Sequence, residues 1–131
     1  MVILDTCAMI FDALAPDQLS RRAVKEMEKA RAEGALSCSN ISLWEIAMLM
    51  SKGRVKVPMP PREFLIDIIA ANKLKVLPIT PDIAYHSSHR PDFAHGDPAD
   101  RIIAATALHH KASLVTCDTK LREMKALKTV W

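Results

Sequence analysis

Five acidic residues stand where short apolar runs end or where helices are predicted to begin. Asp5 directly follows the run Val2-Ile3-Leu4, and Asp118 lies just beyond a similar run that includes Val115. The other three lie at or near predicted helix starts: Glu45, Asp97 and Asp100. Carboxylates gathered at one place repel each other and take up protons unless a cation balances them. Oxygen-only ligands suit Mg²⁺ or Mn²⁺ rather than Zn²⁺, and such sites commonly perform phosphoryl chemistry.

The elements that must position these acids are short apolar strands alternating with helices. Strands are predicted at 2–4, 35–39, 74–77 and 113–116, with an edge strand at 129–131. Helices are predicted over 8–14, 20–33, 42–51 and 62–72, from 80 onward, from 97 to about 110, and briefly after 118. This alternation implies βαβ crossovers and a mostly parallel sheet. We therefore predict one α/β domain over residues 1–131, with a central, mostly parallel sheet of four or five short strands flanked by helices.

In an open parallel sheet, ligands bind at the carboxyl ends of the strands and at the N-termini of the following helices. The five acids can therefore face one crevice, although they lie far apart in sequence. Helix capping offers another explanation for most of them. Ser42 and Glu45 have the spacing of a capping box, Asp97 precedes a proline at a helix start, and Asp118 can cap the helix after it. Asp5, directly after a buried strand, has the least structural reason for its place, so the coincidence of all five favours a site.

Composition sets limits on the partners. The 131 residues fit a single domain, and 18 basic against 15 acidic residues give a mild net charge of +3, which is compatible with a polyanionic partner. An aromatic share of 5% argues against an aromatic platform for single-stranded nucleic acid. Three cysteines without paired spacing predict reduced, largely buried thiols. The N-terminal residues do not resemble a signal peptide and no apolar run is long enough to span a bilayer, which favours a cytoplasmic protein without a membrane partner.

Four stretches of the chain, taken together, resemble the PIN-domain ribonucleases and, among them, the VapC toxins of toxin–antitoxin pairs. These stretches are residues 2–6, 39–46, 97–107 and 114–118. The resemblance implies an endoribonuclease in which Asp5 and Asp100 are the principal ligands of Mg²⁺ or Mn²⁺. Glu45 and Asp118 would complete the acidic pocket, directly or through water, and Asp97 is an uncertain fifth member that we rank below Asp100.

The same resemblance extends to further residues and to partners. Thr6 and Thr116 match hydroxyl residues that line the pocket and hold a water or a carboxylate in place. The family also implies a homodimer with neighbouring active-site grooves, and a cognate VapB-like antitoxin that places a basic side chain among the carboxylates.

Basic residues near the predicted crevice are candidates for RNA contact, because a carboxylate pocket alone would repel RNA. They are Arg101, Lys52, Arg54 and Lys120, for which solvated helix ends are the alternative explanation. His95, ahead of the acidic turn, is a further candidate for touching substrate, whereas His86 and His89 are predicted to be surface residues. An apolar stripe belongs either to the core or to a dimer interface: Trp44, Ala47, Met48, Phe64, Leu65 and Ile68.

Two other functions remain open at this point. One is a PIN nuclease of RNA maturation, or one acting on DNA, without a toxin role. The other is a degenerate PIN module that binds nucleic acid or protein without cleaving. The intact acidic set argues against the degenerate module, because an RNA-binding protein gains nothing from uncompensated negative charge.

Overall fold

The computed structural model describes residues 1–93 and 96–131, and it has a five-stranded sheet at its centre. The strands are β1 (Val2–Leu4), β2 (Leu36–Ser39), β3 (Lys75–Leu77), β4 (Ser113–Val115) and β5 (Lys128–Val130). All neighbours in the order β3-β2-β1-β4-β5 pair in parallel, which confirms the predicted α/β class and the edge position of the last strand.

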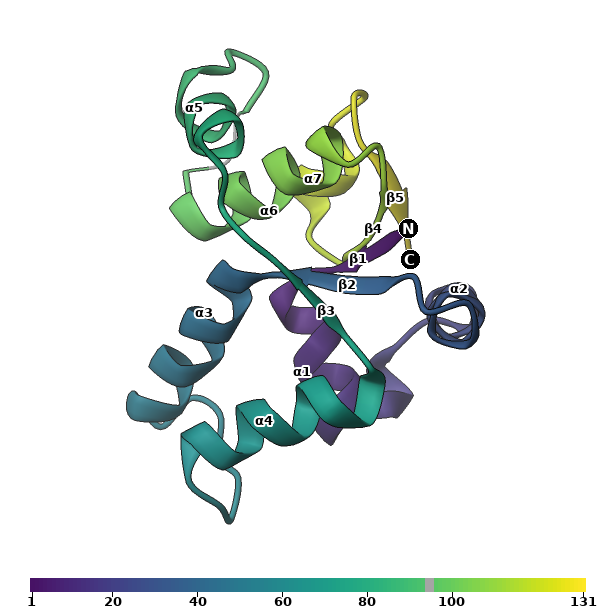
Figure 1. The fold of residues 1–131 in the computed structure, drawn as a ribbon, viewed down its shortest axis with the longest axis vertical. Coiled ribbons are helices and arrows are strands. Elements are labelled where there is room, and N and C mark those ends of the chain that lie inside the picture. Colours follow the sequence, from purple (N-terminus) through teal and green to yellow (C-terminus); the bar gives the residue numbers. More distant parts are fainter. Residues whose placement is uncertain (94–95) are drawn as a thin grey trace.

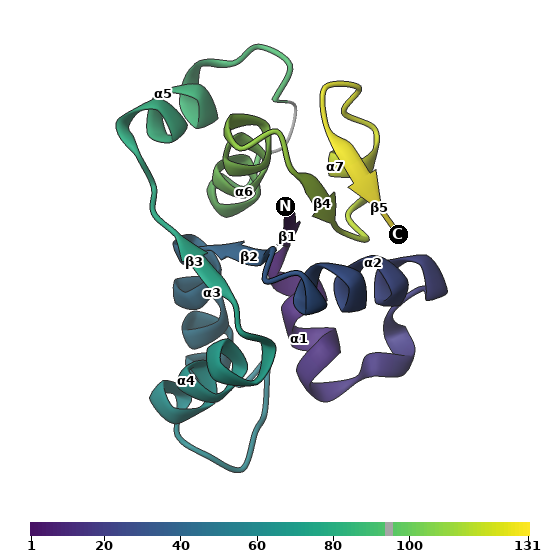
Figure 2. The same cartoon turned by 45° about the vertical axis from the view of Figure 1, so that its right-hand side comes forward.

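Seven α-helices within the described residues flank this sheet, on two sides. They are α1 (Thr6–Leu14), α2 (Arg21–Ala32), α3 (Asn40–Ser51), α4 (Pro61–Asn72), α5 (Pro81–His89), α6 (Pro98–His109) and α7 (Thr119–Arg122), and a 3₁₀ turn (Pro16–Gln18) joins α1 to α2. Figures 1 and 2 show α5, α6 and α7 on one side of the sheet, and α1, α3 and α4 on the other.

Each face of the sheet has its own apolar core, because side chains alternate along a strand. Val2 and Leu4 of β1 pack in a cluster with residues of α1 to α4, whereas Ile3 between them packs with residues of α5, α6 and α7. All three side chains of β1 are buried. A strand covered on both faces is expected to be apolar throughout, as this one is.

The order of the strands determines where a ligand can enter. From the central β1, the chain builds outward through β2 and β3 on one side, and later through β4 and β5 on the other. Leu4 is in register with both Cys38 and Val115, so three neighbouring strands end at nearly the same level. The carboxyl ends of β1 and β4 therefore flank a topological switch point, the place where open α/β sheets bind ligands.

Most helix ends are where the sequence predicts them, but α1 begins at Thr6, two residues before its predicted start. Ser20 and Thr80 cap α2 and α5 by accepting hydrogen bonds from backbone amides, and Gly34 and Gly53 end helices with positive φ angles. Helix α3, however, begins at Asn40 rather than Ser42, and its N-cap is Ser39. The chain passes from β2 into α3 without a loop, so Ser42 lies buried inside the helix and the predicted capping box is wrong.

No helix in the described part of the chain is both long and apolar enough to cross a membrane.

Ile103 anchors α6 to the sheet, and its loss should be costly. The side chain is fully buried among the residues that pack α6 against Ile3 and Leu114. Ile103→Ala should lower the free energy of unfolding by about 3 kcal/mol, because it leaves a cavity in a closely packed core. Urea denaturation measures this change. The matched variant Ile66→Ala, at a side chain that is 51% exposed, should change stability by about 0.5 kcal/mol at most.

Candidate active site

Asp5 occupies the carboxyl end of the central strand and is almost completely buried, with 4% of its surface exposed. Its Oδ1 accepts a hydrogen bond of 3.1 Å from the amide of Ala8, so it is the N-cap of α1. Its Oδ2 accepts a hydrogen bond from the hydroxyl of Thr116. The prediction that Asp5 lacks a structural role is therefore wrong, because the turn from β1 directly into α1 needs a cap.

A buried carboxylate at this position is electrostatically unfavourable. Burial raises the pKa of Asp5 above its ordinary value, and the nearby charge of Asp118 raises it further. The hydrogen bonds from Thr116 and from the amides of Ala8 and Cys7 act in the opposite direction, but they do not cancel the effect of burial. The anionic form of Asp5 would thus be stabilised by a positive charge brought to this edge of the sheet.

Thr116 links the ends of β1 and β4. Its buried hydroxyl donates to Asp5 and accepts a hydrogen bond of 3.0 Å from the amide of Asp118. The side chain of Asp118 in turn caps α7, with Oδ1 accepting from the amide of Leu121 at 3.0 Å. The hydroxyl of Thr116 therefore holds both the side chain of Asp5 and the backbone of Asp118. This is the specific form that its predicted place in the pocket takes.

Glu45 reaches the site from the second turn of α3. Its Oε1 accepts a hydrogen bond from the hydroxyl of Thr6, which also lies 3.0 Å from Ser42 Oγ in a second hydrogen bond. Burial raises the pKa of Glu45, Thr6 lowers it, and the charges of Asp97 and Asp5 raise it. Glu45 is therefore not a capping residue, and two other acids of the predicted site, Asp97 and Asp5, are its electrostatic neighbours.

Asp97 and Asp100 approach from the N-terminus of α6. Asp97 is exposed and caps the helix, with Oδ1 accepting from the amides of Ala99 at 2.8 Å and Asp100 at 3.4 Å. Asp100 lies in the first helical turn and is half-buried. The capping role that the sequence offers for Asp97 is confirmed. The ranking of Asp100 above Asp97 as a ligand stays a prediction.

Two cysteines also belong to this site, although the sequence pattern did not assign them to it. Although Cys7 is exposed as a residue, partial desolvation of its thiol and then the charges of Asp5, Cys117, Asp100 and Glu45 raise its pKa to about 12, so the thiol stays protonated. Cys7 is an exposed residue and Cys117 is half-buried, whereas Cys38 is buried. The prediction of largely buried thiols is therefore wrong for Cys7. The place of Cys7 two residues after Asp5, and that of Cys117 directly before Asp118, is the signal that could have located them.

The donor chemistry of these acids fits a hard divalent cation, because all the donors are carboxylate oxygens. Asp5 among them is buried, and its anionic form is destabilised by that burial and by the charge of Asp118. The electrostatic influences on Asp5, Glu45 and Cys7 connect all five predicted acids into one neighbourhood. Within residues 1–93 and 96–131, however, no group of three or more His, Cys, Asp or Glu side chains is arranged to hold a metal ion. Asp5 and Glu45 instead direct oxygens to Thr116 and Thr6.

The predicted RNA-contacting residues fall into two pairs. Arg101 lies in the first turn of α6 directly after Asp100, and Lys120 lies in α7 two residues after the cap Asp118. Lys52 and Arg54 follow the far end of α3, about 10 Å along the helix axis from Glu45 at 1.5 Å per residue. Their contact with RNA stays a prediction. His95 lies outside the described residues.

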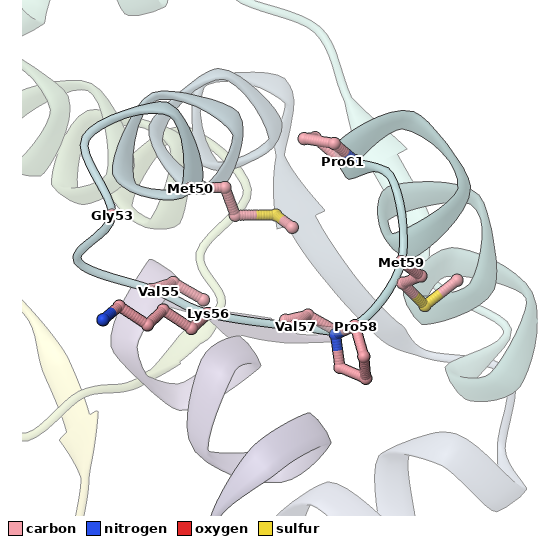
Figure 3. Close-up of a pocket in the computed structure, with 8 residues that line it drawn as sticks. All are labelled: Met50, Gly53, Val55, Lys56, Val57, Pro58, Met59 and Pro61. Carbon is pink, nitrogen blue, oxygen red and sulfur yellow. The ribbon is translucent and has the colours of Figure 1, made fainter.

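The largest opening near α3 is separate from the acids. A cavity of about 580 Å³ lies between the end of α3 and the loop that leads to α4. Met50 points from α3 into the ring formed by this loop, and Val55, Val57 and Met59 line the other side (Figure 3). This cavity has no acidic lining residue, and we assign no chemistry to it.

Thr116 provides a test of how Asp5 is held. Thr116→Val keeps the shape of the side chain but removes the donor to Asp5, and should lower by about 10-fold or more any activity that depends on the orientation of Asp5. Thr116→Ser should restore most of the activity. The matched control is Thr106→Val, since Thr106 is equally buried but donates only to the carbonyl of Ile102 within α6. Equal activity of both valine variants would show that the Thr116 hydrogen bond is unimportant.

Comparison with known proteins agrees with the predicted family and with the observed fold. A family model described as PIN domain matches residues 2–127. The chain therefore belongs to the PIN domain family. It is 33% identical to ribonuclease VapC22 of Mycobacterium tuberculosis over 132 residues, which cover 99% of this chain and 98% of that protein.

Solved structures share the fold. One is a DNA-bound VapBC from Salmonella typhimurium, with a TM-score of 0.71, 20% identity, and coverage of 98% of this chain and 95% of that chain. Another is VapBC2 from Rickettsia felis bound to a fragment of promoter DNA, with a TM-score of 0.69, 18% identity, and coverage of 98% and 97%. At these identities the likeness establishes the fold and nothing further.

Proposed function

We propose that this chain is a Mg²⁺- or Mn²⁺-dependent endoribonuclease that acts as the toxin of a VapBC-type toxin–antitoxin pair. The observation that carries the proposal is the buried Asp5 at the switch point of the sheet. In addition to burial, the charge of Asp118 raises the pKa of Asp5, and the charge of Asp5 in turn contributes to the raised pKa of Glu45. This chain is similar over its whole length to ribonuclease VapC22, and that similarity supports RNA as the substrate.

Asp5 and Asp100 would hold the metal ion, with Glu45, Asp118 and Asp97 as further candidates. When bound, such an ion activates a water molecule and neutralises charge that develops on the phosphate. The chain's own contribution is to hold the acids in place. Thr116 orients Asp5, Thr6 orients Glu45, and the cap of α6 sets the position of Asp97 next to Asp100.

Binding of a polyanion to an acidic pocket requires positive charge at its edge. Arg101 and Lys120 are the best placed of the predicted cations, because Arg101 directly follows Asp100 in α6 and Lys120 lies within two residues of Asp118 in α7. We propose that they contact phosphates beside the scissile bond, and that Lys52 and Arg54 contact RNA farther along α3.

The proposed partners rest on the similarity to known toxin–antitoxin proteins. The solved VapBC structures support a small VapB-like antitoxin as partner, and we propose that it places a basic side chain among the carboxylates in the position of the metal. We also propose a homodimer and a cytoplasmic location, as expected for this kind of toxin.

The test is cleavage of RNA by the purified protein in the presence of Mn²⁺. We expect cleavage by the wild type, and loss of cleavage in Asp100→Asn with the fold intact by circular dichroism. The matched control is Asp82→Asn, an acid in the first turn of α5 that follows a proline, as Asp100 does in α6, but is exposed and outside the site. It should cleave normally.

The biological role needs a separate experiment. Expression in a bacterial host should arrest growth, and co-expression of a small protein encoded beside the gene should relieve the arrest. Metal-dependent cleavage without toxicity would favour a nuclease of RNA processing, and cleavage of DNA in place of RNA would change the substrate. RNA binding that is equal with and without metal, with no cleavage, would favour a degenerate binding module.

A further inference from the structure

A second, mostly apolar groove opens beside the acidic site, between α3 and α6. Its volume is about 500 Å³. Its walls include Ile41, Trp44 and Met48 of α3 and Ile102 of α6, and two acids of the site, Glu45 and Asp97, also line it. The groove and the acidic site therefore have residues in common.

Trp44 is the unusual residue of this groove. It is 60% exposed, although the stripe to which it belongs was predicted to lie in the core or in a dimer interface. Exposed apolar side chains are common singly. An exposed indole that lines an apolar groove next to carboxylates is a different case, because such a surface is typical of a binding site.

We infer that this groove receives an unpaired base of the RNA, from a nucleotide next to the scissile phosphate, and that the base stacks on Trp44. The inference rests on the proposed function. Trp44 directly precedes Glu45 in α3 and both line this groove, so a base on the indole would lie beside an acid of the site. Stacking on an indole ring is tolerant of sequence because every base has a π-face.

The charges at the groove favour a base over an apolar partner surface. Exocyclic amino groups of bases donate hydrogen bonds, and carboxylates such as Glu45 and Asp97 accept them. The homodimer that we propose would then use another face, because a two-fold axis through this groove would bring Glu45 and Asp97 of both copies together in a desolvated interface, which is costly. The groove thus suits a flat, hydrogen-bonding ring better than a copy of itself.

This inference refines the argument from composition. A share of 5% aromatic residues excludes an extended stacking platform, and the described aromatic rings do not form one near the site. One ring in the right place is enough to hold one base.

The first measurement is the steady-state kinetics of RNA cleavage. Trp44→Ala should raise KM about 10-fold with a small change in kcat, and Trp44→Phe should recover most of the loss because it keeps a ring. Tyr85→Ala is the matched control: Tyr85 is 58% exposed, lies on α5 and stacks on His89 instead of lining the groove. Tyr85→Ala should leave KM unchanged.

The second measurement observes the indole directly. Trp131→Phe leaves Trp44 as the only tryptophan, and Asp100→Asn in the same chain prevents cleavage. Addition of a short single-stranded RNA should quench the fluorescence of Trp44. A series of the same RNA with one abasic nucleotide at successive positions should show less quenching at one position beside the cleavage site.

The outcomes separate this inference from the proposed function. If the wild type cleaves RNA but Trp44→Ala has an unchanged KM, the groove does not bind a base although the function holds. If Trp44→Ala converts a dimer into monomers and leaves the KM of the monomer unaltered, the groove is an interface between copies and the inference is overturned. If the wild type cleaves no RNA, the function fails, and position-dependent quenching of Trp44 would still support the groove as a base site.

Discussion

Asp5→Asn should abolish RNA cleavage and at the same time make the protein more stable. We expect a loss of about 10³-fold in kcat/KM, equivalent to about 4 kcal/mol of transition-state stabilisation. The substitution removes a negative charge from the proposed metal-binding position but keeps the size of the side chain. Cleavage of a labelled RNA at saturating Mn²⁺ measures the loss.

The gain in stability follows from the position of Asp5 in the fold. Asparagine can still accept the amide of Ala8 as an N-cap and can still bond to Thr116, so the native hydrogen bonds have replacements. The buried charge disappears, and with it the repulsion from Asp118. We expect an increase of about 1 kcal/mol in the free energy of unfolding at neutral pH, measured by urea denaturation.

The pH dependence of this gain has a defined sign. The pKa of Asp5 is raised in the folded protein, so between its ordinary value of 3.8 and the raised value the folded state binds more protons than the unfolded state. The stability contributed by protonated Asp5 is present below pH 3.8 and is lost as pH rises through this interval. The advantage of asparagine should therefore be small in acid and grow as pH increases.

A second acid of the same helix serves as the control. Asp12 of α1 forms an ion pair with Arg31 at 3.3 Å and lies outside the acidic site. Asp12→Asn should keep full cleavage and bring no gain in stability. Normal cleavage by Asp5→Asn would refute the assignment of Asp5, whatever happens to stability.

The fold could be predicted from the sequence because several local signals agree with each other. The apolar run Val2-Ile3-Leu4 fits a strand buried on both faces, and Asp97-Pro98 marks a helix start that the structure confirms. The strand order could not be predicted, since it depends on the contacts of whole faces. That order brings residues following β1 and β4 together and so makes a single site from distant segments.

Capping was judged incorrectly from the sequence for two acids, both of which were predicted to be site residues. Glu45 has the spacing of a capping box with Ser42, but Ser39 at the end of β2 is the cap, and a pattern of residue types cannot distinguish two serines three positions apart. Asp5 was taken to lack a structural role, yet it caps α1. In both cases the length of the loop between strand and helix decides which residue is the cap. One residue separates β1 from α1 and none separates β2 from α3, and so short a connection has no recognisable sequence pattern.

The hydrogen bonds of the site show why capping and catalysis need not be alternatives. Asp5 uses one oxygen for the helix and one for Thr116, and Asp118 caps α7 while its charge acts on Asp5. Helix N-termini favour negative charge, so a helix start is a suitable place to keep a carboxylate anionic until a cation binds. The same residue can then serve the fold and the site.

Removal of divalent metal should have an effect as large as that of Asp5→Asn. Dialysis against a chelator should reduce RNA cleavage to background, and Mn²⁺ or Mg²⁺ should restore it, because carboxylates alone repel the phosphate backbone. Metal should also raise the stability of the wild type, by about 2.7 kcal/mol at a concentration of 100 times Kd. A thermal melt with and without Mn²⁺ gives this second readout independently of activity.

The dependence of metal binding on pH provides the strictest form of this test. Burial raises the pKa values of Asp5 and Glu45, so protons compete with the metal to a higher pH than they would at exposed carboxylates. The Mn²⁺ concentration for half-maximal stabilisation should therefore fall as pH rises through the interval in which these two groups ionise. Asp100→Asn should lose most of the Mn²⁺-dependent stabilisation, and Asp82→Asn should keep it. Stabilisation by Mn²⁺ that is equal in both variants, or cleavage that survives the chelator, would mean that the acids hold no catalytic metal and that their convergence at the strand ends serves the fold alone.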